Sequence, residues 1–221
     1  MIKLLTLSLL FSTCALFAQV LPVKIDRNNQ IIQYNGFTVS YNELHEQSNW
    51  VSYTLKKENL DCDILAYRKN SFKPDLTIET TYAHSEDYFK SGYDRGHLKP
   101  AADERCNQQK MDETFNMVNI TPQSPAFNRG VWLKLENHVR KLTFESDSVR
   151  IITGPILSAG LKKIKDVSIP EHFFKIIYLY NNNNKKILAY FMDNKKSYAD
   201  LDEFIVPLSF INKMSGFIFP N

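Results

Sequence analysis

A short segment, residues 93–103, places three kinds of reactive side chain around one glycine. Its sequence is YDRGHLKPAAD, with Asp94, Arg95 and His97 in four consecutive positions. Histidine is the side chain whose ordinary pKa suits proton removal from water near neutral pH. Arginine offers a fork of donors that matches phosphate oxygens, and Gly96 permits a conformation or close approach that a side chain would block. The segment suits phosphodiester hydrolysis, but when it is taken alone a single histidine is more often a structural residue.

A second segment carries further polar groups at helical spacing. Asn119 begins the sequence NITPQ, and Asn128, Trp132, Glu136 and Arg140 follow at intervals of four. Steps of four drift about 40° around a helix, so Asn128 and Glu136 are expected on one broad side. An amide oxygen suits Mg²⁺, and a carboxylate two turns away can hold one of its waters. The same residues also fit a plain helix with an Asn128 N-cap and a Glu136–Arg140 ion pair.

Taken together, the two segments closely resemble the DNA/RNA non-specific endonuclease family, whose active site is a ββα-metal motif. DRGHLKPAAD resembles the family's DRGH signature, and FNMVNITPQSPAFNRGVWLKLENHVR resembles its second signature. Weaker similarity extends over about residues 33–219. The family often has Glu where Asn212 stands, at a position remote from both motifs.

The resemblance implies how the reaction centre is built. His97 is expected to be the general base. Asn128 is expected to be the single direct protein ligand of one Mg²⁺ ion, or of Mn²⁺ in its place. Glu136 is expected to orient a water on that ion, and Asn119 to fix the geometry of the base and the metal loop.

The resemblance also implies which residues meet the substrate, DNA or RNA or both. Arg95 and Arg140 are expected to face the phosphate, and Arg68, in YRKNSFKPDL, to contact it as well. Asp94 is expected to brace its loop. Phosphate contacts carry affinity but no base information, so cutting is expected at any sequence, with 5′-phosphate products. The alternatives are a non-catalytic nucleic-acid-binding protein and a phosphodiesterase for small substrates on the same fold.

The strands and helices expected around these residues indicate an α+β fold, with a mainly antiparallel sheet core and flanking helices. One helix is expected over 126–142, from its apolar spacing, and a helix or helical turn over 200–211, broken by Pro207. NNNN, at 181–184, is expected to be a hairpin loop. Strands are expected at 37–41, 50–55, 149–157, 173–180 and 186–192, the third interrupted by a turn at Gly154-Pro155.

The chain has 221 residues, 43% of them hydrophobic, which suits one domain. Residues 1–18 are predicted to be a secretory signal peptide and 19–221 a single endonuclease domain. Met1-Ile2-Lys3 gives a positive start, and the apolar run that follows is short for a membrane span. Cleavage is expected near Ala18-Gln19, giving a secreted or periplasmic protein without a membrane span. An uncleaved anchor and a lipoprotein attached through Cys14 are the alternatives.

Three properties stay open at this stage. Cys62 and Cys106 could form a disulfide in an oxidising compartment or remain two thiols. The net charge of +3 neither requires nor excludes a polyanionic substrate. The oligomeric state is not fixed by the sequence, and a homodimer is possible.

Overall fold

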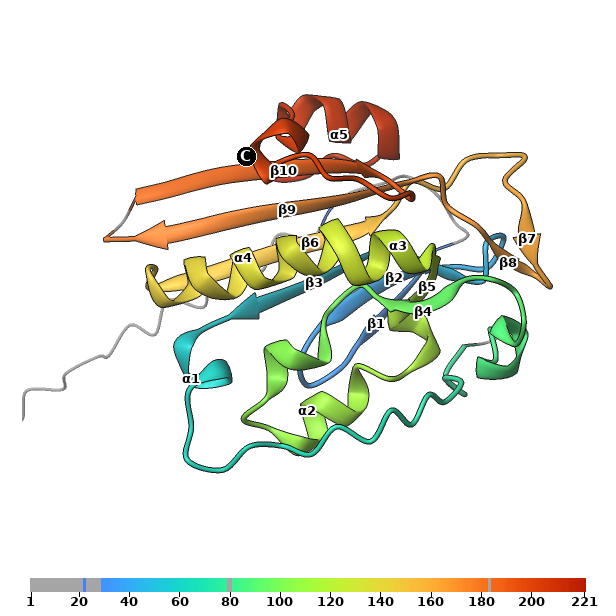
Figure 1. Ribbon diagram of the computed structural model, residues 1–221, viewed down its shortest axis with the longest axis horizontal. Coiled ribbons are helices and arrows are strands. Elements are labelled where there is room, and N and C mark those ends of the chain that lie inside the picture. The colour runs from blue at the N-terminus through green and yellow to red at the C-terminus, as the bar shows by residue number, and fades with distance from the viewer. Residues whose placement is uncertain (1–21, 23–28, 79–80, 183) are drawn as a thin grey trace, which may run out of the picture.

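The computed structural model describes Pro22 and residues 29–78, 81–182 and 184–221 (Figure 1). The expected signal peptide therefore lies outside the described residues. The core is a six-stranded sheet in the order β1-β2-β3-β6-β9-β10, and every neighbouring pair is antiparallel. Its strands are β1 (Asn29–Gln33), β2 (Thr38–Asn42), β3 (Gln47–Leu55), β6 (Ser148–Pro155), β9 (His172–Asn181) and β10 (Asn184–Asp193).

Helices cover both faces of this sheet. Successive residues of a strand point to opposite faces, and Ile151 and Ile152 of β6 accordingly belong to two different buried clusters. Helix α4 (Leu133–Phe144) contributes Leu135 to the cluster of Ile151, whereas α5 (Leu208–Ser215) packs into the cluster of Ile152. Figure 1 shows α4 lying across the strands and α5 beside β10.

A second, smaller strand pair lies beside the main sheet and supports the site. β4 (Asp94–His97) pairs antiparallel with β5 (Ile120–Gln123). The chain then passes through α3 (Pro125–Phe127) and a π-helical turn (Asn128–Trp132) into α4. Two strands followed by a helix form the ββα arrangement that the sequence predicted, so the α+β fold class is confirmed.

The remaining elements are short. The segment between α1 and the first 3-10 turn, residues 61–78, runs along the outside of the molecule below α2 and is called the 61–78 segment (Figure 1). The short elements are α1 (Lys57–Leu60), α2 (Gln108–Glu113), β7 (Lys163–Ile164), β8 (Val167–Ser168), and 3-10 turns at Ser85–Tyr88, Ala101–Glu104, Met117–Asn119 and Leu201–Phe204.

The strand predictions hold except at one turn. β9 and β10 form the expected hairpin, with Asn181 opposite Asn184 and Asn182 in the left-handed region at φ 45°. The predicted turn at Gly154-Pro155 is wrong, because β6 continues through both residues and pairs with β9. Gly154 is required there for close packing, since a Cβ would lie 2.1 Å from the backbone oxygen of Asn49.

The two predicted helices also differ from a regular helix. The predicted helix over 126–142 begins with the π-helical turn, in which Gly130 has the non-helical angles φ −107° and ψ −111°. The prediction of one regular helix between Asn128 and Glu136 is therefore wrong, and their relative direction cannot be taken from 3.6 residues per turn. In the second prediction the break at Pro207 is confirmed, because a 3-10 turn lies before it and α5 begins directly after it, with Pro207 as the N-cap.

The open question about the cysteines is settled by a disulfide. Cys62 and Cys106 are bonded, with their Cα atoms 5.8 Å apart. The bond attaches the start of the 61–78 segment to the turn before α2. Within the described ranges, none of the helices has the length and apolar character needed to cross a membrane.

Candidate active site

His97 ends β4 in an apolar pocket. The side chain is 9% exposed, and its ring lies 4.9 Å from Phe115, edge-on, and 5.6 Å from Phe72. Burial lowers the pKa of His97 to about 3, and the nearby positive charge of Arg68 adds to the effect. The imidazole is therefore neutral at physiological pH and can accept a proton. Its Nε2 atom is buried and has no hydrogen-bond partner among the described residues.

Gly96, just before this histidine, allows the two short strands to pack closely. A Cβ at this position would lie 2.2 Å from the Gln123 side chain, which comes from β5. Gln123 is fully buried, and neither of its amide atoms has a partner in the described part of the chain. The glycine thus serves a close approach rather than an unusual backbone angle.

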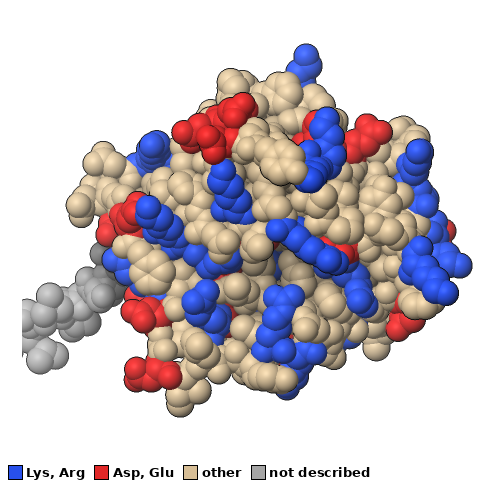
Figure 2. All heavy atoms as spheres, viewed as in Figure 1, with Lys and Arg blue, Asp and Glu red and all other residues tan. Residues whose placement is uncertain are grey.

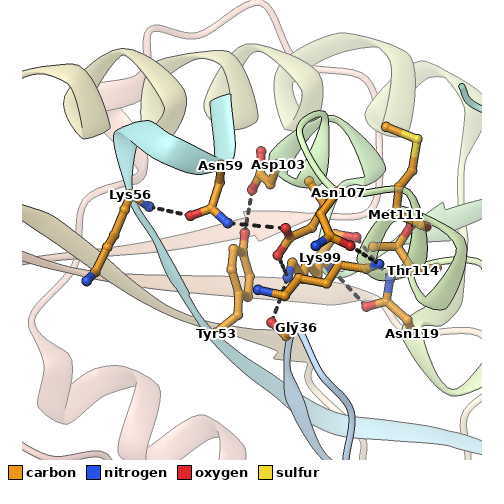
Figure 3. Close-up of polar contacts among 12 residues, drawn as sticks. Gly36, Tyr53, Lys56, Asn59, Lys99, Asp103, Asn107, Met111, Thr114 and Asn119 are labelled. Carbon is orange, nitrogen blue, oxygen red and sulfur yellow. Dashed lines mark hydrogen bonds and ion pairs between the residues drawn. The ribbon is translucent and has the colours of Figure 1, made fainter. Parts of the chain in front are cut away.

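Asn119 holds the chain immediately after the histidine (Figure 3). Its Oδ1 accepts from the Lys99 backbone nitrogen at 2.9 Å, while its Nδ2 donates to the backbone oxygens of Lys99 and Thr114 at 2.9 and 2.8 Å. The backbone oxygen of Asn119 also accepts from Leu98 at 2.9 Å. These bonds fix the direction in which β4 leaves His97.

The Lys99 side chain anchors the same loop in the protein interior. It is completely buried, forms an ion pair with Glu104 and donates to the Gly36 backbone oxygen at 2.6 Å (Figure 3). A buried ammonium group is stable only when it is paired in this way. The loop after His97 is thus held by its backbone and by a side chain.

Asn128 begins the π-helical turn and is tied to the other end of β4. Its Nδ2 donates to Asp94 Oδ2 at 2.9 Å. Because a carboxylate can only accept, the amide nitrogen must face Asp94, and the amide oxygen is left to face a cation. Arg129 completes the arrangement with two bonds to Asp94, at 2.8 and 2.6 Å.

These bonds also fix the charge of Asp94. Burial opposes its ionisation, but the hydrogen bonds from Arg129 and Asn128 outweigh that effect and lower its pKa. Asp94 therefore stays ionised and braces the turn that carries Asn128.

Glu136 lies on α4 among charged neighbours. Burial raises the pKa of Glu136 to about 7, while the positive charge of Lys175 opposes this effect. Arg68 also stabilises the ionised form. A carboxylate with a pKa near neutrality gains or loses its proton in response to small changes in its surroundings.

Lys175 was missed by the sequence analysis. It lies on β9, is 1% exposed, and donates to the Leu98 backbone oxygen at 3.4 Å. Its Nζ is 4.5 Å from the centre of the Trp132 ring. Burial lowers the pKa of Lys175 to about 8, and the Glu136 carboxylate is its main favourable neighbour. The signal was available in the sequence, as a single lysine inside the apolar run FFKIIY.

Arg140 faces the interior. Its Nη1 donates to Asp103 at 2.7 Å and its Nη2 donates to Asn137 at 2.8 Å. The Tyr53 hydroxyl donates to the other oxygen of Asp103 at 2.9 Å (Figure 3). Arg140 is 8% exposed, so its guanidinium is committed to this buried group.

The other two predicted arginines lie at the mouth of the histidine pocket. The Arg68 guanidinium is 5.2 Å from the centre of the Phe115 ring, and the Arg95 guanidinium is 4.6 Å from that of Phe72. These are the two rings that enclose His97. Arg68 donates to Asn70 at 2.7 Å, and burial lowers its pKa.

The predicted residues thus form one region with a single exception. His97, Arg68 and Arg95 share the Phe72–Phe115 pair, and Asn128 is attached to the same strand through Asp94. Glu136 joins them through its electrostatic interactions with Arg140 and Arg68, whereas the Arg140 guanidinium itself donates to Asp103 in the interior. Lys and Arg side chains gather across the middle of this face, with Asp and Glu mostly near its edges (Figure 2).

The chemistry of these groups fits a divalent cation. The amide oxygen of Asn128 makes no hydrogen bond to the other described residues, and oxygen ligands are those that Mg²⁺ prefers. In the described part of the chain, no group of three or more His, Cys, Asp or Glu side chains is placed to hold a metal ion. With its strand pair, helix and buried neutral histidine, the site defines a nuclease of the ββα-metal class.

Comparisons with known proteins agree with this class. A model of the DNA/RNA non-specific endonuclease family matches residues 17–221. A nuclease of Syncephalastrum racemosum is 34% identical over 215 residues, which cover 86% of this chain and 67% of that protein. The human mitochondrial endonuclease G is 32% identical, with 87% and 70% covered. The chain belongs to the DNA/RNA non-specific endonuclease family.

Two further matches define the extent of the similarity. The mitochondrial nuclease EXOG of Danio rerio is 32% identical over 84% of this chain, but the match spans only 59% of that protein. A crystal structure of the EndoG/EndoGI complex superposes with a TM-score of 0.80 at 29% identity, covering 86% of this chain and 84% of that one. The common domain is thus shared nearly whole, while some relatives are considerably longer.

Proposed function

We propose that the protein is an exported endonuclease that hydrolyses phosphodiester bonds of DNA, RNA or both, without regard to base sequence. The observation that carries the proposal is the environment of His97. A neutral, buried imidazole with an unpartnered nitrogen lies beside two arginines, on the ββα motif of a nuclease family. Burial leaves this imidazole a weak base, and an anionic phosphate bound beside it would raise its pKa towards the range that suits proton removal from water.

The residues divide the reaction between them. His97 takes a proton from water, the resulting hydroxide attacks phosphorus, and the bond to the 3′-oxygen breaks. The leaving oxygen takes a proton from solvent, and His97 returns its proton to solvent. The products are a 5′-phosphate and a 3′-hydroxyl. A bound divalent ion, Mg²⁺ or Mn²⁺, supplies positive charge for the phosphate and the leaving oxygen. Asn128 would hold this ion through its amide oxygen, with Asp94 orienting that amide and Glu136 acting through a water.

The arginines account for binding without sequence preference. Arg68 and Arg95 offer guanidinium groups at the mouth of the pocket, and phosphate oxygens are their natural partners. Contacts of this kind position the nucleic acid but do not read its bases. Arg140, which is committed to Asp103, would act by supporting Glu136 on the same helix.

Two observations support export. The charged start and apolar run of residues 1–18 have the pattern of a signal peptide. The disulfide between Cys62 and Cys106 fits an oxidising compartment. Expression of the full chain in a bacterial host, followed by N-terminal sequencing of the exported protein, tests this. A first residue near Gln19 supports it, and retention of Met1 in the cytoplasm contradicts it.

The nuclease proposal is tested by digestion of supercoiled plasmid and of RNA. Purified protein is assayed with Mg²⁺, Mn²⁺, Ca²⁺ or EDTA. Nicking and then fragmentation without discrete bands is expected with Mg²⁺ or Mn²⁺, and no cutting with EDTA. The new 5′ ends should require phosphatase treatment before they can be labelled by polynucleotide kinase. No cleavage of either polymer under any metal condition would refute the proposal.

A charge-matched pair of variants tests substrate binding. Arg68→Ala should raise KM for nucleic acid and reduce the salt dependence of binding by about one phosphate contact. Lys213→Ala removes the same charge from the exposed side of α5, on the opposite face of the sheet, and should change neither. An equal effect of both variants would contradict the assigned role of Arg68.

A further inference from the structure

One large aromatic side chain near the site has no structural explanation. Tyr67, in the 61–78 segment, is 73% exposed. Its ring and hydroxyl make no hydrogen bond or ring contact with the other described residues. Burying an aromatic ring is favourable, so an exposed ring beside a binding site is available to a ligand that would cover it.

The backbone that carries this ring is held firmly. Gln108 of α2 bonds to both sides of Tyr67: it accepts from the backbone nitrogen at 2.8 Å and donates to the backbone oxygen at 3.0 Å. Asp112 holds the Gln108 amide at 2.8 Å, and the preceding Ala66 donates to the Arg105 backbone at 2.7 Å. The ring is thus presented from a fixed position, which lowers the entropy cost of binding a ligand.

The next residue in the chain connects the ring to the reaction centre. Arg68 is the guanidinium at the mouth of the His97 pocket and interacts electrostatically with both His97 and Glu136. Consecutive Cα atoms are about 3.8 Å apart. A nucleotide adjoining a phosphate bound at Arg68 would therefore lie near the chain segment that carries the exposed ring.

We propose that Tyr67 is a stacking platform for an unpaired base next to the scissile phosphate, which makes single-stranded nucleic acid the preferred substrate at this subsite. The inference rests on the proposed nuclease function. A tyrosine ring stacks on any base, so the contact adds affinity without adding sequence preference. A base inside a duplex is already stacked on both faces and cannot use this platform unless it leaves the helix.

The test measures steady-state cleavage of a fluorescent single-stranded oligonucleotide. Tyr67→Ala should raise KM about 5- to 150-fold, the range for loss of one base–aromatic stack, with little change in kcat. Tyr67→Phe and Tyr67→Trp should keep the wild-type KM because they keep the ring. Leu76→Ala, which removes a 77% exposed aliphatic side chain from the same segment, is the matched control and should have no effect.

Two further substrates make the result specific to a base. On a blunt duplex of the same sequence, Tyr67→Ala should change KM much less than on the single strand. On an oligomer of abasic deoxyribose phosphates, wild type and Tyr67→Ala should have equal KM. An unchanged KM on the single strand overturns the inference, and so does an equal rise on the abasic oligomer. If the wild-type protein cuts nothing, the proposed nuclease function fails instead.

Discussion

The disulfide between Cys62 and Cys106 gives a prediction whose size follows from the structure. It closes a stretch with a sequence separation of 44 residues. In the chain-entropy model, a closed loop of this length restricts the unfolded chain enough to stabilise the fold by about 4 kcal/mol. A Cys62→Ser/Cys106→Ser double variant should therefore lose stability of this order while keeping its fold.

The same variant should alter substrate binding more than chemistry. The bond lies six residues before Arg68, and the other attachments near Arg68 are noncovalent, among them hydrogen bonds to Arg105 and Gln108 and the ion pair of Lys69 with Asp112. Without the covalent tether the guanidinium is less well positioned, so KM should rise. His97 is held separately by the Asn119 bonds, so kcat should change little.

Equilibrium urea unfolding, followed by tryptophan fluorescence, measures the first effect, and steady-state cleavage in Mg²⁺ measures the second. Wild-type protein kept in dithiothreitol is the control and should match the double variant in both assays. A stability loss below about 1 kcal/mol would mean that the bond does not restrict the unfolded chain as calculated. A fall in kcat with unchanged KM would refute the link to Arg68.

Three further predictions concern the ββα motif. Gly96→Ala should destabilise the protein by about 1–3 kcal/mol in urea unfolding, because its Cβ would overlap Gln123; an unchanged midpoint would contradict the close approach. Asp94→Ala should raise the Mg²⁺ concentration for half-maximal activity about 10- to 100-fold, since it removes the acceptor that holds the amide of Asn128. An unchanged Mg²⁺ titration would exclude this bracing role. Burial raises the pKa of Glu136 to about 7, so kcat/KM should fall as the pH drops below 7 and the carboxylate gains its proton. Saturating Mg²⁺ should move this fall to lower pH. A value of kcat/KM that does not change between pH 5 and 7 would disprove the prediction.

Much of the fold could be predicted from local sequence. Runs of aromatic and β-branched residues identified β2, β3, β6, β9 and β10 of the main sheet, because such side chains fill its buried faces, whereas β1 was not predicted. The four asparagines at 181–184 identified the β9–β10 hairpin, since asparagine tolerates the left-handed conformation that Asn182 adopts. These features depend on neighbours in the chain, and a single sequence is sufficient to read them.

The errors occurred where tertiary contacts overrule local preference. Gly154-Pro155 is a typical turn pair, yet β6 continues through it because the chain must pass close to Asn49. The π-helical turn at Asn128–Trp132 leaves no mark in a periodicity of 3.6 residues. The helix expected to position Asn128 and Glu136 was therefore right in extent and wrong in geometry.

The site was predictable in its residues but not in their partners. The spacing of Arg140 and Glu136 suggested an ion pair between them, whereas Arg140 bonds to Asp103, 37 positions earlier in the chain. Lys175 comes from a strand that carries no motif at all. Partners distant in sequence are set by the packing of α4 on the sheet, which no local pattern encodes.

The central claim is that His97 activates water for attack on phosphorus. The most direct measurement compares kcat of His97→Ala with that of the wild type on plasmid DNA in Mg²⁺, with DNA binding measured separately in EDTA. The account predicts a loss of about 10²- to 10⁴-fold in kcat, with DNA affinity and thermal stability close to wild type. Cleavage by His97→Ala at the wild-type rate would contradict it.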